Sequence, residues 1–310
     1  MRRPRRSRAW KLLGVPSLAC LVLGSVSRAR AAETVVFNGG RAFEDLKRIV
    51  AFGPRPSGSP ALAETRQYIL RQLRRAGIEV EEDSFVAATP AGNLPMTNLI
   101  AKLPGTRPQV IIVGGHYETK RFAQFRFVGA NDGGSSAALL LELARVLKQR
   151  RNTFTIWLVF FDGEEALVEW SARDGLYGSR HLAAQLSADG RLARVRAMIL
   201  VDMIGDARLN VQRDLNSTPW LSDLAFDIAH RLGYARFFSG TRSAFEDDHL
   251  PFVNAGVPAV DLIDLDYGPN NSYWHTPADT VDKCSPASLT IVGRVVTALL
   301  DALDKSPHLR

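Results

Sequence analysis

The alternation of apolar and polar residues divides the chain into expected strands separated by expected helices. A short continuous apolar run, Phe154 to Phe161, is rich in β-branched and aromatic residues. Such a run is typical of a strand that is buried on both faces. Further strands are predicted at residues 97–103, 110–115, 198–204 and 258–263, and an edge strand at residues 78–86.

Helical periodicity fills the stretches between these strands. Helices are predicted at residues 42–51, 60–76, 133–149, 219–232 and 287–303. The second begins with Ser59 as an N-cap and Pro60 in the first turn, and Gly77 can close it. The third places Leu139, Leu143, Val146 and Leu147 on an inward face.

Strands that alternate with helices indicate an α/β fold. We expect a single domain with a mostly parallel, mixed central β-sheet flanked by helices on both faces. The sequence contains no internal repeat, no low-complexity block and no linker. We therefore predict one large catalytic domain over residues 32–310.

The first 31 residues have a different composition from the rest. Residues 1–9 contain five arginines and no acid, residues 12–26 are apolar, and Ala29-Arg30-Ala31 precedes Ala32. This order predicts a signal peptide over residues 1–31. The apolar run is shorter than the roughly 20 residues of a membrane span. An uncleaved anchor, or a lipoprotein signal using Cys20, are the alternatives. We expect an exported protein, periplasmic or secreted, that is monomeric and has no stable membrane association after signal removal.

The leader also accounts for the basic character of the chain. The formal net charge is +7, and residues 1–31 contribute +8, which leaves about −1 for residues 32–310. The high isoelectric point therefore gives no support to nucleic-acid binding, and no nucleic-acid partner is expected. Only Cys284 remains outside the leader, so the mature chain cannot form an internal disulfide.

Side chains that can bind metals or transfer protons follow the ends of several predicted strands. They are His116, Asp132, Glu164, Glu165, Asp202 and His275. The carboxyl ends of strands in an α/β sheet meet at one crevice, where ligands bind. A lone histidine there is more often structural than a ligand. The whole set is harder to explain by structure alone, and its mixture of histidine and carboxylates favours zinc.

Five stretches of sequence carry a resemblance to a known family. They are HYETK at His116, FVGANDGG around Asp132, FFDGEEALVEWSARDGLYGSRHLA, DDHLPF at Asp247, and YWHTPADT at His275. On these stretches the chain resembles the animal-type glutaminyl-peptide cyclotransferases, or glutaminyl cyclases. That family shares its fold with zinc aminopeptidases. The resemblance extends from about Phe43 to Leu303.

The resemblance implies a reaction and a role for each matching residue. The reaction is the intramolecular cyclisation of an N-terminal glutamine of peptides or proteins to pyroglutamate, with release of ammonia. One Zn²⁺ per chain would act as a Lewis acid, and Glu164 would shuttle the proton. The implied residues are Asp132, Glu165 and His275 as zinc ligands, Glu164, Asp202 and Asp247 as catalytic residues, and Trp170 and Trp274 in the substrate pocket.

Structural interpretations remain open for several of these residues. Trp170 could serve only in packing, and Trp274 could be a lid residue without substrate contact. Asp247 could belong to a capped helix N-terminus, and His249 is expected to be structural. Glu169 and Asp174 are interpreted as a solvated loop face.

The main alternative activity is a zinc-dependent exo-aminopeptidase with two metals. Its ligands would be His116, Asp132 and Asp202 for one zinc, and Asp132, Glu165 and His275 for the other. Three features favour the cyclase. They are the nine residues Ala166 to Asp174 after the paired glutamates, Asp247 where the peptidases often have serine, and tryptophan before His275.

A third possibility is a catalytically inactive member that only binds. Loss of Asp132, Glu164, Glu165 or His275 would favour it, and none is lost. The chain departs from the cyclase pattern at Glu118, where the family usually has aspartate, which leaves the orientation of His116 open. The loop at residues 264–276 also differs from the family, so its pocket-lining residues cannot be assigned.

Overall fold

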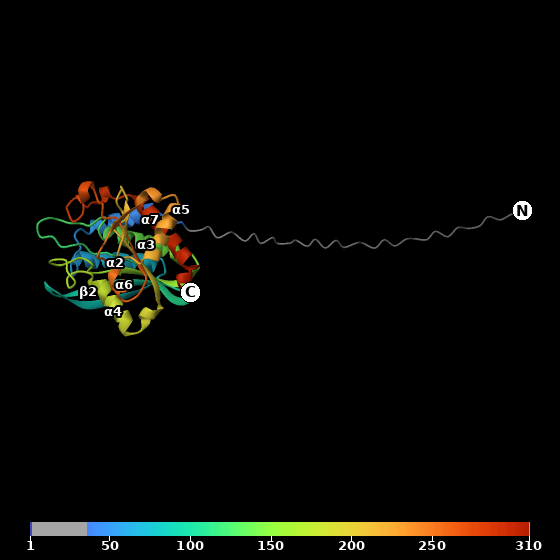
Figure 1. Cartoon of the computed structure of the whole chain (residues 1–310), viewed down its shortest axis with the longest axis horizontal. Coiled ribbons are helices and arrows are strands. Elements are labelled where there is room, and N and C mark those ends of the chain that lie inside the picture. The colour runs from blue at the N-terminus through green and yellow to red at the C-terminus, as the bar shows by residue number, and fades with distance from the viewer. Residues whose placement is uncertain (2–35, 310) are drawn as a thin grey trace. The chain divides into compact units, whose positions relative to one another are not determined.

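A computed structural model describes residues 36–309 together with Met1. Apart from Met1, the predicted signal peptide over residues 1–31 lies outside the described residues. The described chain forms one α/β body around a twisted mixed sheet (Figure 1). This architecture confirms the predicted fold class.

The sheet has eight strands in the order β1-β2-β4-β3-β5-β8-β6-β7. The strands are β1 Glu79–Thr89, β2 Gly92–Leu103, β3 Gly105–His116, β4 Asn152–Phe161, β5 Val195–Asp202, β6 Val211–Asp214, β7 Phe238–Ser243 and β8 Ala259–Ile263. Four of the seven strand pairings are parallel, including the central ones from β4 through β3 and β5 to β8. The antiparallel pairings lie toward the two edges.

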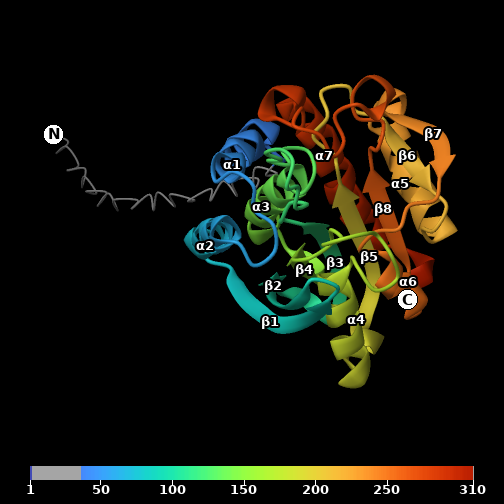
Figure 2. The same cartoon turned by 90° about the vertical axis from the view of Figure 1, so that its left-hand side faces the viewer.

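Seven α-helices cover the two faces of the sheet. They are α1 Gly39–Ala51, α2 Pro60–Arg75, α3 Gly134–Lys148, α4 Tyr177–Ala188, α5 Pro219–Arg231, α6 Leu250–Asn254 and α7 Pro286–Leu303. Helices α1, α2, α3, α5 and α7 share one hydrophobic core with the sheet, whereas α4 and α6 pack on the opposite face (Figure 2). The sheet is therefore the middle layer of three.

The period-two alternation of each strand assigns its side chains to these two cores. In β2, Leu99 and Ala101 contact the five-helix side, whereas Ile100 contacts the side of α4. In β4, Leu158 likewise contacts the five-helix side, and Val159 contacts the side of α4. Both sides of the central strands are thus buried, which explains why their sequence is a continuous apolar run.

The helix ends follow their sequence signals. Ser59 accepts a hydrogen bond from the Leu62 N–H at the start of α2, where Pro60 occupies the first turn. Helix α7 is capped by Ser285 in the same manner. By length and composition alone α7 could cross a membrane, but its apolar residues are buried in the five-helix core, as expected for a core helix.

Four elements were missed by the sequence pattern: α4, α6, β6 and β7. Strand β6 has only four residues, two of them polar, and α6 has only five residues. Such short segments are too brief to establish a periodicity. Their positions come from packing against β8 and α4 rather than from local pattern.

The register of the parallel strands aligns their carboxyl ends at one edge. His116, the last residue of β3, pairs with Phe161, the last of β4, and Asp202 of β5 pairs with Ile263 of β8. Loops that leave these four strands therefore start from the same edge, where the candidate chemistry lies.

A buried acid stabilises the loop that follows β8. The Asp264 carboxylate accepts the backbone N–H of Asn210 at 2.7 Å and that of Asp266 at 3.1 Å. Burial nevertheless raises the pKa of Asp264 to about 7, because two neutral donors do not replace its hydration. The folded state thus holds a proton that the unfolded state releases near pH 4.

We predict that Leu143→Ala destabilises the protein by about 2–5 kcal/mol, because this α3 side chain is fully buried between the sheet and the helices. The control is Leu215→Ala, since Leu215 is 58% exposed. This change should alter stability by no more than about 0.5 kcal/mol. Urea unfolding measures both. Equal effects of the two variants would contradict the core assignment.

We predict a pH signature for Asp264→Asn. Between about pH 4 and pH 7 the folded state binds more protons at Asp264 than the unfolded state, so its contribution to stability falls as pH rises. The asparagine variant lacks this fall. Between pH 4.5 and 7.5, the free energy of unfolding of the variant should therefore rise relative to that of the wild type. The expected rise is about 1.4 kcal/mol for each unit by which folding raises the pKa of Asp264. A difference between the two proteins that does not change with pH would disprove the assignment.

Candidate active site

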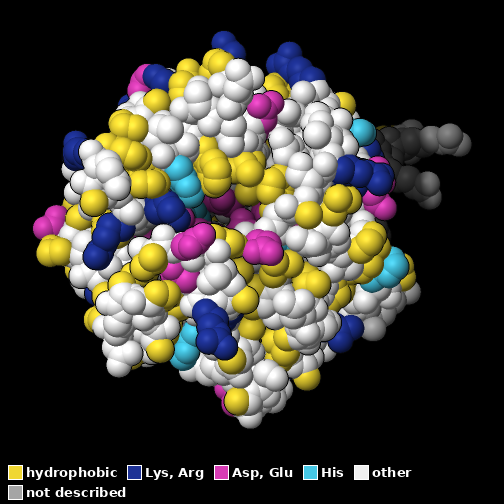
Figure 3. Space-filling view, turned by 60° about the vertical axis from the view of Figure 1, so that its left-hand side comes forward, with side chains coloured by type: hydrophobic (Ala, Val, Ile, Leu, Met, Phe, Trp, Pro, Cys, Tyr) yellow, Lys and Arg dark blue, Asp and Glu magenta, His cyan; other side chains and the backbone are white. Residues whose placement is uncertain are grey.

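The predicted functional side chains converge on one cavity at the carboxyl edge of the sheet. The cavity has a volume of about 420 Å³. All eight predicted site residues line it: Asp132, Glu164, Glu165, Trp170, Asp202, Asp247, Trp274 and His275. A recess on this face of the molecule shows histidine and acidic side chains in its depth and hydrophobic side chains along its edge (Figure 3).

Asp132, Glu165 and His275 form a compact group of donor atoms. His275 Nε2 lies 3.0 Å from Glu165 Oε1 and 3.3 Å from Asp132 Oδ2. One ligand atom from each residue lies within 4.8 Å of the other two. Burial opposes a charge on His275, but the contacts with the carboxylates of Asp132 and Glu165 outweigh it and raise the pKa of the imidazole to about 10. The two carboxylates therefore favour a positive charge at this position.

This donor group fits zinc. It offers one imidazole nitrogen and two carboxylate oxygens, a mixture that zinc accepts, and three protein ligands leave a coordination position for substrate. Asp132 Oδ2 is buried and accepts no hydrogen bond from the described residues. An unsatisfied buried carboxylate oxygen facing a histidine nitrogen is the arrangement that a bound cation would complete.

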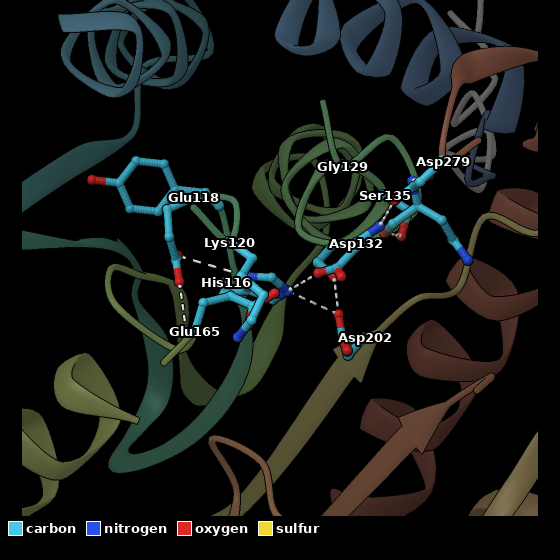
Figure 4. Close-up of polar contacts among 12 residues, drawn as sticks. His116, Glu118, Lys120, Gly129, Asp132, Ser135, Glu165, Asp202 and Asp279 are labelled. Atoms are coloured by element: carbon cyan, nitrogen blue, oxygen red, sulfur yellow. Dashed lines mark hydrogen bonds and ion pairs between the residues drawn. The ribbon is translucent and has the colours of Figure 1, made fainter. Parts of the chain in front are cut away.

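His116 lies behind this group and joins it to Asp202. Its Nε2 atom is 3.1 Å from Asp202 Oδ1 and 3.3 Å from Asp132 Oδ1 (Figure 4). Glu118 stands where the family usually has aspartate. Its Oε2 atom is 3.6 Å from His116 Nδ1, a distance that allows an ion pair but is too long for a hydrogen bond. Instead, Glu118 Oε1 accepts the backbone N–H of Glu165 at 3.1 Å. The longer side chain thus supports the segment that carries the paired glutamates.

Glu164, Asp202 and Asp247 are buried carboxyl groups that line the same cavity. Burial, and then the charge of Glu165, raise the pKa of Glu164 well above its usual range. Burial and the charges of Asp202 and Asp248 do the same for Asp247. Burial also raises the pKa of Asp202, although His116 opposes the shift. The surroundings thus favour the protonated forms of these side chains, and perturbed pKa values of this kind are frequent at sites of proton transfer.

The acidic segment is not a capped helix end. Helix α6 begins after His249 and has no side-chain cap, and Asp247 Oδ1 accepts the backbone N–H of Asp248 instead. His249 is fully buried and pairs with Asp214 at 2.9 Å. Next to it, Asp261 of β8 is buried with no hydrogen bond to either carboxylate oxygen among the described residues. The capping interpretation of Asp247 is wrong, and an acid network backs this wall of the cavity.

The interpretation of Asp174 as part of a solvated loop face is also wrong. Its side chain is buried, and its carboxylate accepts the backbone N–H groups of Leu167, Val168 and Glu169 at 2.8–2.9 Å. The Tyr177 hydroxyl donates to the same carboxylate. One acid thus organises the whole insertion. Glu169 is exposed, as expected.

The organised insertion presents Trp170 to the cavity. The base of the loop is closed by two backbone hydrogen bonds, from Leu176 N to Glu164 O and from Tyr177 N to Gly163 O, each 2.7 Å long. Trp170 lines the cavity and is 37% exposed, so it is not a core side chain.

Aromatic side chains surround His275. Trp274 stacks on the imidazole with ring centroids 4.1 Å apart, and Phe122 and Phe127 approach it edge-on. Trp274 also lines the cavity and is 38% exposed. These contacts restrict the imidazole to one orientation, which helps a ligand histidine hold its position.

The backbone at the site adopts a conformation that costs energy. His275 and the residue after Asp202, Met203, have φ values of 52° and 51°, although neither is glycine. Such conformations persist where surrounding contacts enforce them, and they cluster at functional sites. Gly133, after Asp132, has φ 74°, and a Cβ there would lie 2.3 Å from Glu118 O. No other residue fits at that position.

Sequence reasoning missed three residues that support the donor group. Lys120 pairs with Glu165 at 3.0 Å. The Asp279 carboxylate accepts the backbone N–H groups of Asn131 and Asp132. Arg55 is fully buried and donates to the carbonyls of Tyr117, Val128 and Gly129, and burial lowers its pKa to about 10. Lys120 lies in the stretch HYETK and Asp279 in the stretch YWHTPADT, so the resemblance to the family could have indicated both residues. Arg55 lies in none of the stretches that carry the resemblance.

Comparisons with known proteins agree with this geometry. The sequence profile of peptidase family M28 matches residues 98–300. A glutaminyl-peptide cyclotransferase of Drosophila melanogaster is 32% identical over 271 residues, which cover 78% of this chain and 76% of that protein.

Solved structures give the same result. The crystal structure of a glutaminyl cyclase from an Acidobacteriales bacterium superposes with a TM-score of 0.85 at 44% identity, and covers 87% of this chain and 96% of that one. A Zn-dependent exopeptidase from Parabacteroides distasonis has a TM-score of 0.76 at 23% identity over 86% of this chain and 99% of its own. The second likeness shows the shared fold alone.

We predict that His275→Ala lowers zinc affinity by more than about 100-fold, because loss of a ligand costs more than loss of its supporting partner. Competition with a chromophoric chelator measures the affinity. His181→Ala is the control, since His181 is a histidine outside the donor group that pairs with Asp83. A His275 variant that keeps wild-type affinity would show that another residue holds the metal.

Proposed function

The chain belongs to peptidase family M28 and, within it, to the glutaminyl-peptide cyclotransferases, and on this basis we propose that it cyclises the N-terminal glutamine of peptides and proteins to pyroglutamate, releasing ammonia. The observation that carries the proposal is the insertion at residues 166–174. It places Trp170 at the wall of the cavity that also contains Glu164 and the donor group.

The substrate geometry makes a protein nucleophile unnecessary. The α-amine of an N-terminal glutamine can reach the amide carbonyl of its own side chain and close a five-membered lactam. Intramolecular reactions of this kind gain effective concentrations of roughly 10⁵–10⁸ M when the groups are aligned. The enzyme must therefore hold one conformer, exclude water and move one proton.

The side chains of the cavity divide these tasks. Zinc held by Asp132, Glu165 and His275 would supply Lewis acidity toward the amide carbonyl. Trp170 and Trp274 offer flat apolar walls for the side chain of the glutamine. Glu164 takes the proton from the attacking amine and returns it to the departing amide nitrogen, so that the C–N bond breaks as ammonia leaves. Its buried carboxyl carries the proton between the two nitrogens.

Asp202 and Asp247 complete the polar side of the cavity. Both line it, and the charge of Asp202 acts on Asp247, which indicates that the two carboxyl groups are close together. In the proposal they hydrogen-bond to the amide nitrogen and to each other, and so hold the side-chain amide against Glu164.

We propose one zinc per chain. The donor group of Asp132, Glu165 and His275 opens to the cavity through His275, whose side chain is 21% exposed. The alternative group around His116 and Asp202 contains a histidine that is almost fully buried and does not line the cavity.

We further propose an exported, monomeric protein that acts on peptides outside the cytoplasm. The signal-peptide pattern in residues 1–31 supports export. Cys284 is a buried free thiol, so an oxidising compartment would not link it to a second chain while the protein stays folded.

The direct test gives the purified holoenzyme a glutamine-initiated peptide and a matched leucine-initiated peptide, followed by mass spectrometry. The proposal predicts that the first peptide loses ammonia and the second stays intact. Release of a free N-terminal amino acid from either peptide would establish an aminopeptidase instead. Binding of both without conversion would establish an inactive binding member.

We predict that Glu164→Gln keeps zinc but lowers kcat by about 10²–10⁴-fold, the range for loss of a general acid–base group. The amide retains the shape of the side chain and cannot carry the proton. Zinc content measured on the same samples separates this effect from metal loss. A variant with near-normal turnover would refute the proton-transfer role.

A further inference from the structure

One polar contact joins the Trp170 loop to the segment that carries Asp247. The indole Nε1–H of Trp170 donates to Glu246 Oε2 at 2.7 Å. The two residues are 76 positions apart in the sequence, and both line the cavity. Glu246 is exposed and directly precedes Asp247. No role in the reaction described above requires its side chain.

The opposite edge of the indole is also fixed. Gly175 has φ 125°, and a Cβ at this position would lie 3.1 Å and 3.2 Å from Trp170 Cζ3 and Cε3. The six-membered ring therefore lies against the bare backbone of Gly175, while the five-membered ring reaches Glu246. With the loop itself held by Asp174, the remaining freedom of the indole is rotation of its side chain.

We propose that Glu246 is a positioning residue that holds the Trp170 indole as a preformed wall of the cavity and thereby sets the affinity for the N-terminal glutamine. This inference rests on the proposed function. A half-exposed tryptophan without a hydrogen-bond partner would sample several rotamers, and the substrate would have to order it on binding. The bond to Glu246 removes that cost before the substrate arrives.

The inference specifies which kinetic constant changes. The indole contacts the bound glutamine in the ground state and in the transition state alike, because it takes no part in bond making. Loss of such uniform binding raises KM and leaves kcat unchanged. Loss of a proton-transfer or metal-binding group would instead lower kcat.

The charge of Glu246 offers a competing explanation, since a carboxylate at the rim could attract a cationic substrate. Glu246→Gln separates the two, because the amide oxygen can still accept the indole hydrogen bond while the charge is gone. Glu246→Ala removes both. The matched control is Glu169→Ala, which removes an exposed acidic side chain next to Trp170. In the described part of the chain, the Glu169 carboxylate makes no hydrogen bond or ion pair.

The experiment measures the three variants as holoenzymes by two independent methods. The first is the indole N–H resonance of Trp170 in protein labelled with ¹⁵N-tryptophan, assigned by its loss in Trp170→Phe. The second is KM and kcat for a glutamine-initiated peptide. For Glu246→Ala we expect an upfield shift of the resonance and a KM raised about fivefold, the effect of one hydrogen bond, with kcat within about twofold. Glu246→Gln and Glu169→Ala should resemble wild type in both.

Three results would overturn the inference. They are an unshifted indole resonance in Glu246→Ala, a shifted resonance with unchanged KM, and a KM in Glu246→Gln as high as in Glu246→Ala, which would assign the effect to charge. Failure of the proposed function is distinguishable. In that case the wild-type enzyme would not convert the peptide, while the resonance would still report the hydrogen bond.

Discussion

The structure depends on the confinement of many acidic side chains at one edge of a buried sheet. The parallel register brings the ends of β3, β4, β5 and β8 together, and carboxyl groups follow each of them. Burying one unpaired carboxylate is costly, and burying several is possible only if they share protons or a cation. His275 acquires its high proton affinity from this constraint, and zinc ligation would satisfy the same charges. The raised pKa of Glu164 is a consequence of the same crowding.

A second set of acids shapes the site without taking part in it. Asp174 and Asp279 each use a carboxylate to bind successive backbone N–H groups, and so hold the Trp170 loop and the Asp132 loop. These scaffolding contacts are separate from the donor group. In the proposed function, the loops that border the cavity distinguish cyclisation from hydrolysis. Function on this fold is therefore determined by loops rather than by the sheet.

The predictability of the molecule from sequence follows from the same physics. The continuous apolar run of β4 and the periodic faces of α3 and α7 are strong patterns, so the fold class and the convergence of strand ends were predicted correctly. The boundaries were less certain, and β6 and α6 were missed because four or five residues hold no periodicity. Asp174 was misjudged because a carboxylate that bonds to backbone groups looks in sequence like a solvated one. Glu246 and Arg55 could not have been found, since their partners are distant in the chain.

The central claim is that the attacking group is the amine of the substrate and not water. Incubation of the holoenzyme with a glutamine-initiated peptide in H₂¹⁸O, followed by mass spectrometry of every product, tests it most directly. The account predicts a cyclised peptide that has lost ammonia and carries no ¹⁸O. Incorporation of ¹⁸O into free glutamine or into a newly formed carboxylate would show that the same donor group activates water, and that the chain is a hydrolase.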